Sequence, residues 1–375
     1  MGAGLQHPLM GARLENLLAA FGTHGGPRPA ALPLALVMVL SAVLRTPFRG
    51  MDAWRRARLR QRRPALADPV FIIGHWRSGT THLHNLLSCS PAFGHISPLA
   101  SGLPDEVLTL GTWLRPLLER ALPEDRHVDR VAVAPDSPQE DEIPLANLQP
   151  LSVFHALYFP QRFHETAMRG IFFDDTSARE IARWQRHAQR FAETIALHQD
   201  RPLLLIKNPV YTARIHRLLE IWPQARFIHI HRNPYEVFVS TRHYYRRMLR
   251  ELALQASDDV DVEAFVLAVY QRLMARFDAE RPLLGAGQFI EVSYQRLQEQ
   301  PQETLREIHA ALNLPQWEAT WPRAQAYLDT VAGYQRNRYV ISEADLRRVD
   351  HHWASYVQRW GYTAPPLCQT PTRPG

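Results

Sequence analysis

A loop with two glycines follows a short apolar run near residue 70. Gly74 and Gly79 are separated by four residues, and the apolar run before them covers residues 70–73. Backbone N–H groups of such a loop bind anions, and the N-terminus of the helix that follows adds its dipole. We therefore predict that this segment binds phosphate or sulfate. Its candidate binding residues are Arg77, Ser78, Gly79, Thr80 and Thr81.

The same loop argues against ATP as the ligand. ATP-binding loops of this spacing carry a lysine that reaches the terminal phosphates, and Thr80 stands at that position here. Magnesium sites also need a carboxylate, but the predicted strand over residues 226–231 is followed by Arg232, an asparagine and a proline. We expect a site that uses arginine and hydroxyl groups, without a metal ion.

Lys207 is the only lysine, and the other 42 of the 43 basic residues are arginine. A lysine kept in such a background indicates a position that needs a compact, mobile ammonium group rather than a planar guanidinium group. The alternative is that Lys207 survives by chance at a surface position.

Strand and helix patterns alternate from residue 68 onward. Four apolar runs of strand length are separated by segments with apolar residues every three or four positions, and Ser177 with Glu180 forms a capping box before one of these helices. This alternation predicts an α/β domain with a parallel central sheet flanked by helices. The predicted strands are residues 70–73, 203–206, 226–231 and 288–292.

The segment over residues 69–87 closely resembles the 5′-phosphosulfate loop of the sulfotransferase family. This family uses 3′-phosphoadenosine 5′-phosphosulfate (PAPS) as its donor. The dipeptide before the loop serine is commonly Pro-Lys or Pro-Arg in the family, whereas this chain has Trp76 and Arg77. Arg77 still supplies a positive charge for the phosphate or the sulfate.

Two further segments resemble the family in the expected order. Arg232 stands at the end of the predicted strand over residues 226–231, directly after its last residue, and Ser240 follows eight residues later, which is similar to the family's 3′-phosphate motif. Tyr294 matches a tyrosine that faces the adenine in the family. Across residues 68–314, the resemblance implies a PAPS-dependent sulfotransferase with a P-loop-like, three-layer α/β fold.

Within that resemblance, Lys207 matches a lysine near the bond that breaks. Sulfuryl transfer builds negative charge on the oxygen that bridges sulfur to the departing 5′-phosphate. An ammonium group aimed at this oxygen stabilises mainly the transition state. The resemblance therefore implies a catalytic role for Lys207.

The general base is expected within the acidic run over residues 136–142. Some sulfotransferases use a glutamate shortly after the first helix, but residues 93–98 contain none. The candidates are Glu140, Asp141 and Glu142. Glu140 and Glu142 would share a side of an extended segment, while a helical start would separate them. The alternative is an exposed helix N-terminus whose acids complement the helix dipole.

Other candidates near the predicted site are less specific. His75 or His155 could act as a base, and the histidines near the loop could hold a metal, although most buried histidines only satisfy hydrogen bonds. Arg336 and Arg338 could close over the 3′-phosphate, or they could be solvated surface residues.

The first 67 residues are expected to form a helical extension before a sulfotransferase domain over residues 68–364 and a loose tail over 365–375. Residues 30–44 are apolar but too short to span a membrane, and six arginines follow between positions 55 and 63. This segment, residues 29–63, either packs on the main domain as a helical hairpin or contacts an anionic membrane surface.

Composition sets the remaining expectations. Hydrophobic residues make up 46% and charged residues 21%, which excludes disordered, collagen-like and multi-span membrane chains. A net charge of +6 suits an anionic ligand but is too small and too spread out to indicate nucleic acid. Two cysteines and no typical signal peptide favour a cytoplasmic protein, with peripheral contact to the inner face of the membrane as an option.

We therefore expect an enzyme that moves a sulfuryl group from PAPS to a hydroxyl, or less readily an amine, of a small acceptor. The aromatic residues between positions 154 and 184 suit a lipid-like or aromatic acceptor, although such residues more often build a core. The alternatives are an ATP-dependent small-molecule kinase and an inactive, membrane-associated nucleotide-binding protein. The sequence does not indicate an oligomeric state.

Overall fold

The computed structural model describes residues 7–121, 137–331 and 340–366. Within them, five parallel strands form one sheet in the order β2-β3-β1-β4-β5. The four predicted strands are confirmed with ends that differ by one residue at most, whereas the two-residue β2 was not predicted. The strands are β1 (Val70–Ile73), β2 (Phe93–Gly94), β3 (Leu203–Lys207), β4 (Arg226–His231) and β5 (Phe289–Ser293).

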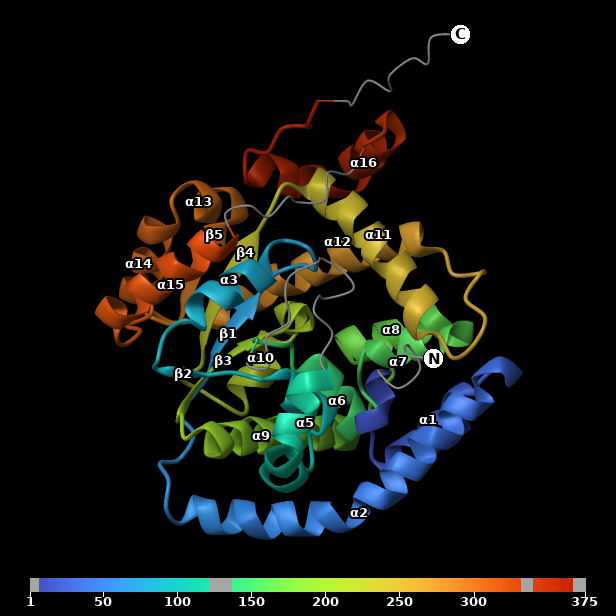
Figure 1. The fold of residues 1–375 in the computed structure, drawn as a ribbon. Helices are drawn as coiled ribbons and strands as arrows, with labels where there is room; N and C mark the ends of the chain where they lie inside the picture. The colour runs from blue at the N-terminus through green and yellow to red at the C-terminus, as the bar shows by residue number, and fades with distance from the viewer. Residues whose placement is uncertain (1–6, 122–136, 332–339, 367–375) are drawn as a thin grey trace.

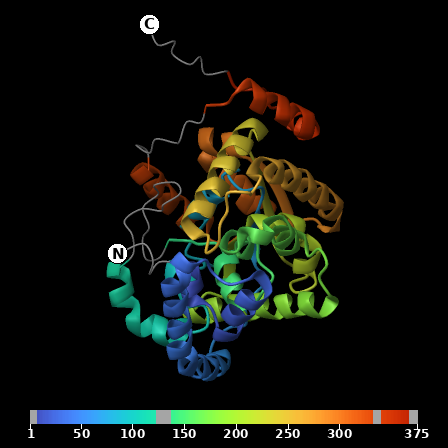
Figure 2. The same ribbon diagram turned by 90° about the vertical axis from the view of Figure 1, so that its right-hand side faces the viewer.

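Helices cover both faces of this sheet (Figures 1 and 2). Alternate residues of β1 point to opposite faces, so Ile72 packs in one buried core with Leu86, while Phe71 packs in a second core with Trp184. This arrangement confirms the predicted three-layer α/β fold. The helices that follow β1 are α3 (Thr80–Leu87), α4 (Pro98–Gly102), α5 (Thr112–Ala121), α6 (Glu142–Leu148), α7 (Phe154–Tyr158), α8 (Phe163–Phe172), α9 (Ala178–Gln199), α10 (Ile215–Leu219), α11 (Pro234–Leu252), α12 (Val262–Glu280), α13 (Tyr294–Glu299), α14 (Pro301–Ala311), α15 (Trp317–Val331) and α16 (Glu343–Arg359).

The strand register brings the ends of the strands to one edge of the sheet. Ile72 of β1 pairs with Lys207 of β3, and His231 of β4 pairs with Ser293 of β5. Because all strands are parallel, the loop after β1, the last residue of β3 and the residues after β4 and β5 meet at the same edge. Ligands of open α/β sheets bind at this edge, where the strand order reverses.

Helix patterns of the sequence also match the structure in detail. The capping box of Ser177 and Glu180 is present at the start of α9. The aromatic residues between 154 and 184 mostly build core, since Phe154, Tyr158 and Trp184 are each at most 5% exposed.

The N-terminal segment contains two helices, α1 (Leu14–His24) and α2 (Leu32–Arg60). Both lie within the helical extension expected over the first 67 residues, although no bounds were predicted for α1, and α2 extends well beyond the apolar stretch over residues 30–44. By length and composition alone, Pro29–Arg60 is long and apolar enough to cross a membrane. In the structure, α2 lies along an outer edge of the molecule, at the bottom of Figure 1.

Candidate active site

The loop after β1 is held by contacts that require glycine at both of its ends. Gly74 donates its N–H to the hydroxyl of Thr212 at 2.8 Å, and a Cβ at Gly74 would lie 2.3 Å from the carbonyl oxygen of Ile230. Gly79 has φ of 100° and begins the turn into α3, and a Cβ there would lie 2.2 Å from the ring of Tyr294. Any larger residue at Gly79 would push the loop away from Tyr294.

Ser78 lies inside this loop with a buried hydroxyl. The residue is 2% exposed, and its Oγ has no hydrogen-bond partner among the residues that the structure describes. A buried hydroxyl without a partner carries a desolvation cost that a bound oxyanion would remove. The loop therefore fits the anion site that the sequence predicts for it.

Arg77, Arg232, Ser240 and Tyr294, which we call the arginine cluster, lie next to the loop. Arg77 Nε donates to Ser240 Oγ at 3.0 Å, and Arg232 Nη1 donates to the carbonyl oxygen of Arg77 at 3.4 Å. The guanidinium group of Arg232 lies 4.8 Å from the ring centroid of Tyr294. Four predicted donor-binding residues thus meet in space; they come from the first loop, the segment between β4 and α11, helix α11 and the first residue of α13.

Charge in the arginine cluster is partly compensated. Arg232 pairs with Glu236 in the first turn of α11, with 2.6 Å between Nη2 and Oε2. Ser240 lies one further turn along the same helix and is 1% exposed. An anion held by Arg232 would therefore share the guanidinium group with Glu236.

Lys207 ends β3 and is buried, with 2% of its surface exposed. This excludes the alternative of a chance surface lysine. Its Nζ contacts Glu140 Oε1 and lies 3.4 Å from Thr81 Oγ1. The structure therefore joins the only lysine to the anion loop on one side and to the predicted acidic run on the other.

Helix α6 begins within the acidic run, so Glu140 precedes the helix and Glu142 belongs to it. Glu142 is the first residue of this helix and Asp141 is its N-cap, so the helical start separates Glu140 from Glu142. Asn208 donates to Asp141 Oδ1 and to Glu142 Oε2, both at 2.8 Å. Asp141 and Glu142 are 4% and 1% exposed, so the alternative of an exposed helix N-terminus is wrong.

Asp141 and Glu142 belong to a buried polar network that supports the site. Burial raises the pKa of Asp141 to about 7; the hydrogen bond from Tyr211 opposes this, and the charge of Glu142 adds to it. Glu142 also accepts a hydrogen bond from the backbone N–H of Val153 at 3.2 Å. Of the predicted base candidates Glu140, Asp141 and Glu142, it is Glu140 that contacts Lys207.

Sequence analysis did not single out Asn208, Tyr211 or Thr212. Asn208 and Tyr211 donate hydrogen bonds to the carboxylate of Asp141 in the acidic run. The hydroxyl of Thr212 accepts a hydrogen bond from the backbone N–H of Gly74. Their position directly after Lys207, at the carboxyl end of β3, is the signal that could have identified them.

The histidine candidates have structural partners. His75 is buried with Nδ1 2.9 Å from the carbonyl oxygen of Trp76, and burial lowers its pKa to about 4. Both ring nitrogens of His155 lie within 3.0 Å of backbone carbonyl oxygens. Within the described part of the chain, no group of three or more His, Cys, Asp or Glu side chains could hold a metal ion. Arg336 and Arg338 lie outside the described residues.

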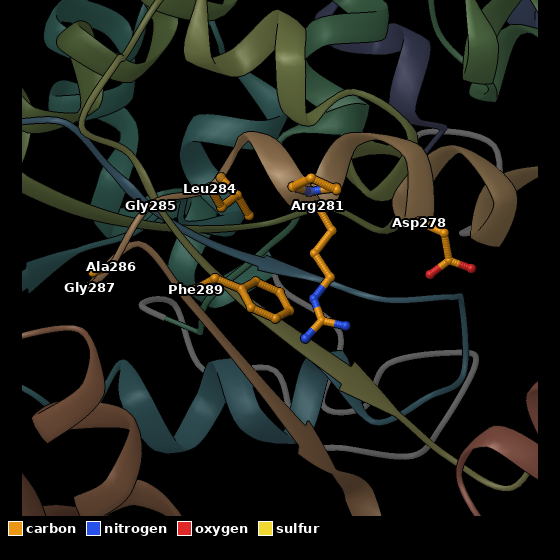
Figure 3. A pocket seen from close by; sticks show the side chains of 8 residues that line it. Asp278, Arg281, Leu284, Gly285, Ala286, Gly287 and Phe289 are labelled. Carbon is orange, nitrogen blue, oxygen red and sulfur yellow. The ribbon is translucent and has the colours of Figure 1, made fainter.

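A cavity of about 560 Å³ lies at the amino end of β5 (Figure 3). Because the strands are parallel and Lys207 is the last residue of β3, the cavity and Lys207 lie at opposite edges of the sheet. Arg281, Leu284 and Phe289 line part of it, and the guanidinium group of Arg281 lies 4.9 Å from the Phe289 ring centroid. This cavity is separate from the loop and the arginine cluster.

Comparison with known proteins decides the family. The model of a family described as the sulfotransferase family matches residues 69–319, which include the loop, Lys207, Arg232 and Tyr294. The chain belongs to the sulfotransferase family. The resemblance found in three motifs is thereby confirmed, and the protein is a sulfotransferase.

Relatives and solved structures agree with this assignment. The omega-hydroxy-beta-dihydromenaquinone-9 sulfotransferase Stf3 of Mycobacterium bovis is 32% identical over 299 residues, which cover 79% of this chain and 76% of the relative. The protein of the same name from Mycobacterium tuberculosis matches equally well.

Two crystal structures share the fold of this sulfotransferase. Sulfotransferase STF9 from Mycobacterium avium has a TM-score of 0.66 at 16% identity and covers 94% of this chain and 97% of its own. Sulfotransferase STF1 from Mycobacterium tuberculosis has a TM-score of 0.61 at 18% identity and covers 91% of this chain and 90% of its own.

Proposed function

We propose that this sulfotransferase moves the sulfuryl group of PAPS to a hydroxyl of a small, lipid-like or aromatic acceptor. The observation that carries the proposal is the position of Lys207, which contacts both Thr81 of the anion loop and Glu140. A cation and a carboxylate beside an anion loop are the groups that sulfuryl transfer to a hydroxyl requires.

The donor would be held by residues from three strand ends. Backbone N–H groups of residues 78–81 and the hydroxyl of Ser78 would bind the 5′-phosphate, Arg232 and Ser240 would bind the 3′-phosphate, and Tyr294 would border the adenine. The buried Ser78 hydroxyl and the two arginines of the cluster support an anionic donor. PAPS supplies the activated sulfuryl group.

Lys207 and Glu140 would share the chemistry. In the proposed reaction the bond between sulfur and the oxygen of the 5′-phosphate breaks as the acceptor oxygen bonds to sulfur, so the electron pair leaves with adenosine 3′,5′-bisphosphate. Lys207 would stabilise the charge on that leaving oxygen, and Glu140 would take the proton of the acceptor hydroxyl. Asn208 would act as a positioning residue, because it holds the two carboxylates that follow Glu140.

The acceptor class rests on a different observation. The name of the Mycobacterium bovis relative describes a sulfotransferase of a hydroxylated menaquinone, which is a lipid with an alcohol group. At 32% identity over 79% of this chain, a lipid-like alcohol is the acceptor class that we expect here, with an amine as the less favoured nucleophile.

A transfer assay tests this proposal. Purified protein receives PAPS with radiolabelled sulfur and, in separate reactions, a long-chain primary alcohol, a phenol or a hydroxylated isoprenoid quinone, with a chelator in place of metal. We expect a labelled sulfate ester that forms in equal amount with adenosine 3′,5′-bisphosphate. A phosphorylated acceptor made from ATP and magnesium, with no ester from PAPS, would instead support the kinase alternative.

A further inference from the structure

Helix α2 presents a continuous row of exposed apolar side chains. These residues recur at spacings of three and four along the helix, so they share one face, and each of them is exposed. The most exposed are Leu36 at 69%, Trp54 at 58% and Leu40 at 55%. We call this row the α2 stripe; it consists of Leu32, Leu36, Leu40, Val43, Pro47, Met51 and Trp54.

The opposite face of α2 packs against the main body of the protein and forms hydrogen bonds with it. Met38 is fully buried in the core. Arg45 donates to both carboxylate oxygens of Glu106 at 2.9 Å and to the carbonyl oxygen of Ala12 at 2.6 Å. Asp52 accepts from the backbone N–H of Leu108 at 3.0 Å. The helix is thus fixed in orientation with its apolar stripe outward.

These anchors decide between a spanning helix and an interfacial one. A membrane-spanning α2 would place Arg45 and Asp52 in hydrocarbon and separate Arg45 from Glu106, which is strongly unfavourable. A helix that lies in the plane of the interface keeps the ion pair of Arg45 with Glu106 and the hydrogen bond of Asp52, and it still buries its stripe among the lipids. The geometry therefore fits a helix on the membrane surface.

The charge along α2 matches an anionic surface. Asp52 is the only acidic residue in the helix and it is buried, whereas Arg58, Arg60 and Arg62 are exposed. Among the described residues, acidic side chains from neighbouring elements pair with some of the arginines of this segment. These pairs are Glu106 with Arg45, Glu15 and Asp105 with Arg49, Glu193 with Arg60, and Asp200 with Arg63.

Aromatic side chains extend the apolar surface beyond the helix. Trp54 lies under the guanidinium group of Arg58, which is 4.6 Å from its ring centroid. Trp113 of α5 is 53% exposed and lies edge-on to Phe48 of α2, with 6.1 Å between the ring centroids. Exposed tryptophans beside arginines are typical of the zone where a membrane meets water.

We propose that α2 docks this sulfotransferase onto an anionic lipid surface, with the α2 stripe in the headgroup region and the arginines against the lipid phosphates. The inference goes beyond the proposed function, because it depends on neither the donor nor the chemistry of the site. Docking would bring the enzyme to acceptors that are dissolved in the membrane.

Co-sedimentation with vesicles tests the docking. We expect the full chain to bind vesicles that contain phosphatidylglycerol, to bind pure phosphatidylcholine vesicles more weakly, and to be released by salt. The double variant Leu36→Glu, Leu40→Glu should lose more than about a hundredfold in vesicle affinity, because both apolar contacts disappear. The double variant Arg58→Glu, Arg62→Glu should lose at least about thirtyfold, on anionic vesicles only.

Matched variants outside α2 test whether any exposed leucine or arginine that is replaced by glutamate weakens vesicle binding. Leu283→Glu changes a leucine that is 55% exposed, and Arg347→Glu changes an arginine whose side chain is 72% exposed, both outside α2. Both should bind vesicles as the unmodified chain does. Lys207→Ala should also bind normally, so a failure of the proposed chemistry is distinguishable from a failure of docking.

Two results would overturn the proposal. The first is that the unmodified chain stays in the supernatant when anionic vesicles sediment, or that the Leu36→Glu, Leu40→Glu variant sediments with these vesicles as well as the unmodified chain does. The other is a dimer in sedimentation velocity that Leu36→Glu, Leu40→Glu converts into a monomer, because a second copy of the chain would then cover the α2 stripe.

Discussion

Lys207→Ala is expected to lower kcat about a thousandfold, because it removes the cation that stabilises the leaving oxygen in the transition state. The lysine is buried at the end of β3 beside Thr81 and Glu140. Since its charge acts mainly on the transition state, the affinity for adenosine 3′,5′-bisphosphate should change much less than kcat. Steady-state kinetics and calorimetry on the same variant measure the two effects.

Lys207→Arg is the matched control for charge. It keeps a positive group, but a planar guanidinium is larger and cannot take the place of a compact ammonium in a buried position. We expect it to restore little of the lost turnover. A Lys207→Ala enzyme with kcat within about fivefold of the unmodified enzyme would contradict the catalytic role, provided that its thermal unfolding is unchanged.

Glu140→Gln is expected to lower kcat by about a hundredfold to ten-thousandfold, the usual range for loss of a general base. Glutamine has nearly the same shape and leaves an oxygen for Lys207, so the fold should stay intact. Glu140 is partly exposed, with 23% of its side-chain surface accessible, but the variant leaves the buried Lys207 ammonium without its carboxylate, so we also expect a lower urea midpoint of unfolding.

Glu142→Gln separates this role from a structural one. Glu142 accepts hydrogen bonds from Asn208 and from Val153, and a glutamine would turn a donor group toward one of these donors. We expect this variant to lose about 1–3 kcal/mol of unfolding free energy. If Glu142→Gln abolishes turnover without loss of stability while Glu140→Gln remains active, the assignment of the base to Glu140 is wrong.

The main elements of the fold could be predicted from the sequence because their signals are local. Each of the four predicted strands is a short segment rich in apolar residues; β1, β3 and β4 are mostly buried, whereas β5 alternates between buried and half-buried residues. The strand β2 has two residues, too few for a pattern, and it exists because Phe93 and Gly94 pair with β3. Helix α1 is stabilised by tertiary packing of Leu17 and Ala20, which short-range patterns do not report.

Some residues of the candidate site could also be predicted from the sequence, and others could not. Arg77, Arg232, Ser240 and Tyr294 could be proposed from motif spacing, and the structure brings them together because the parallel register aligns the strand ends. Which carboxylate meets Lys207 could not be predicted. It depends on where α6 begins and on contacts from Asn208, more than sixty residues along the chain.

Calorimetry with adenosine 3′,5′-bisphosphate tests the central claim, a donor site for PAPS, most directly. The account predicts metal-independent binding that Arg232→Ala weakens by about tenfold to a hundredfold, as expected for lost charge-assisted hydrogen bonds to phosphate. Arg347→Ala, at an arginine with 72% of its side chain exposed, should bind as the unmodified protein does. Absence of bisphosphate binding together with tight binding of ATP and magnesium would contradict the account.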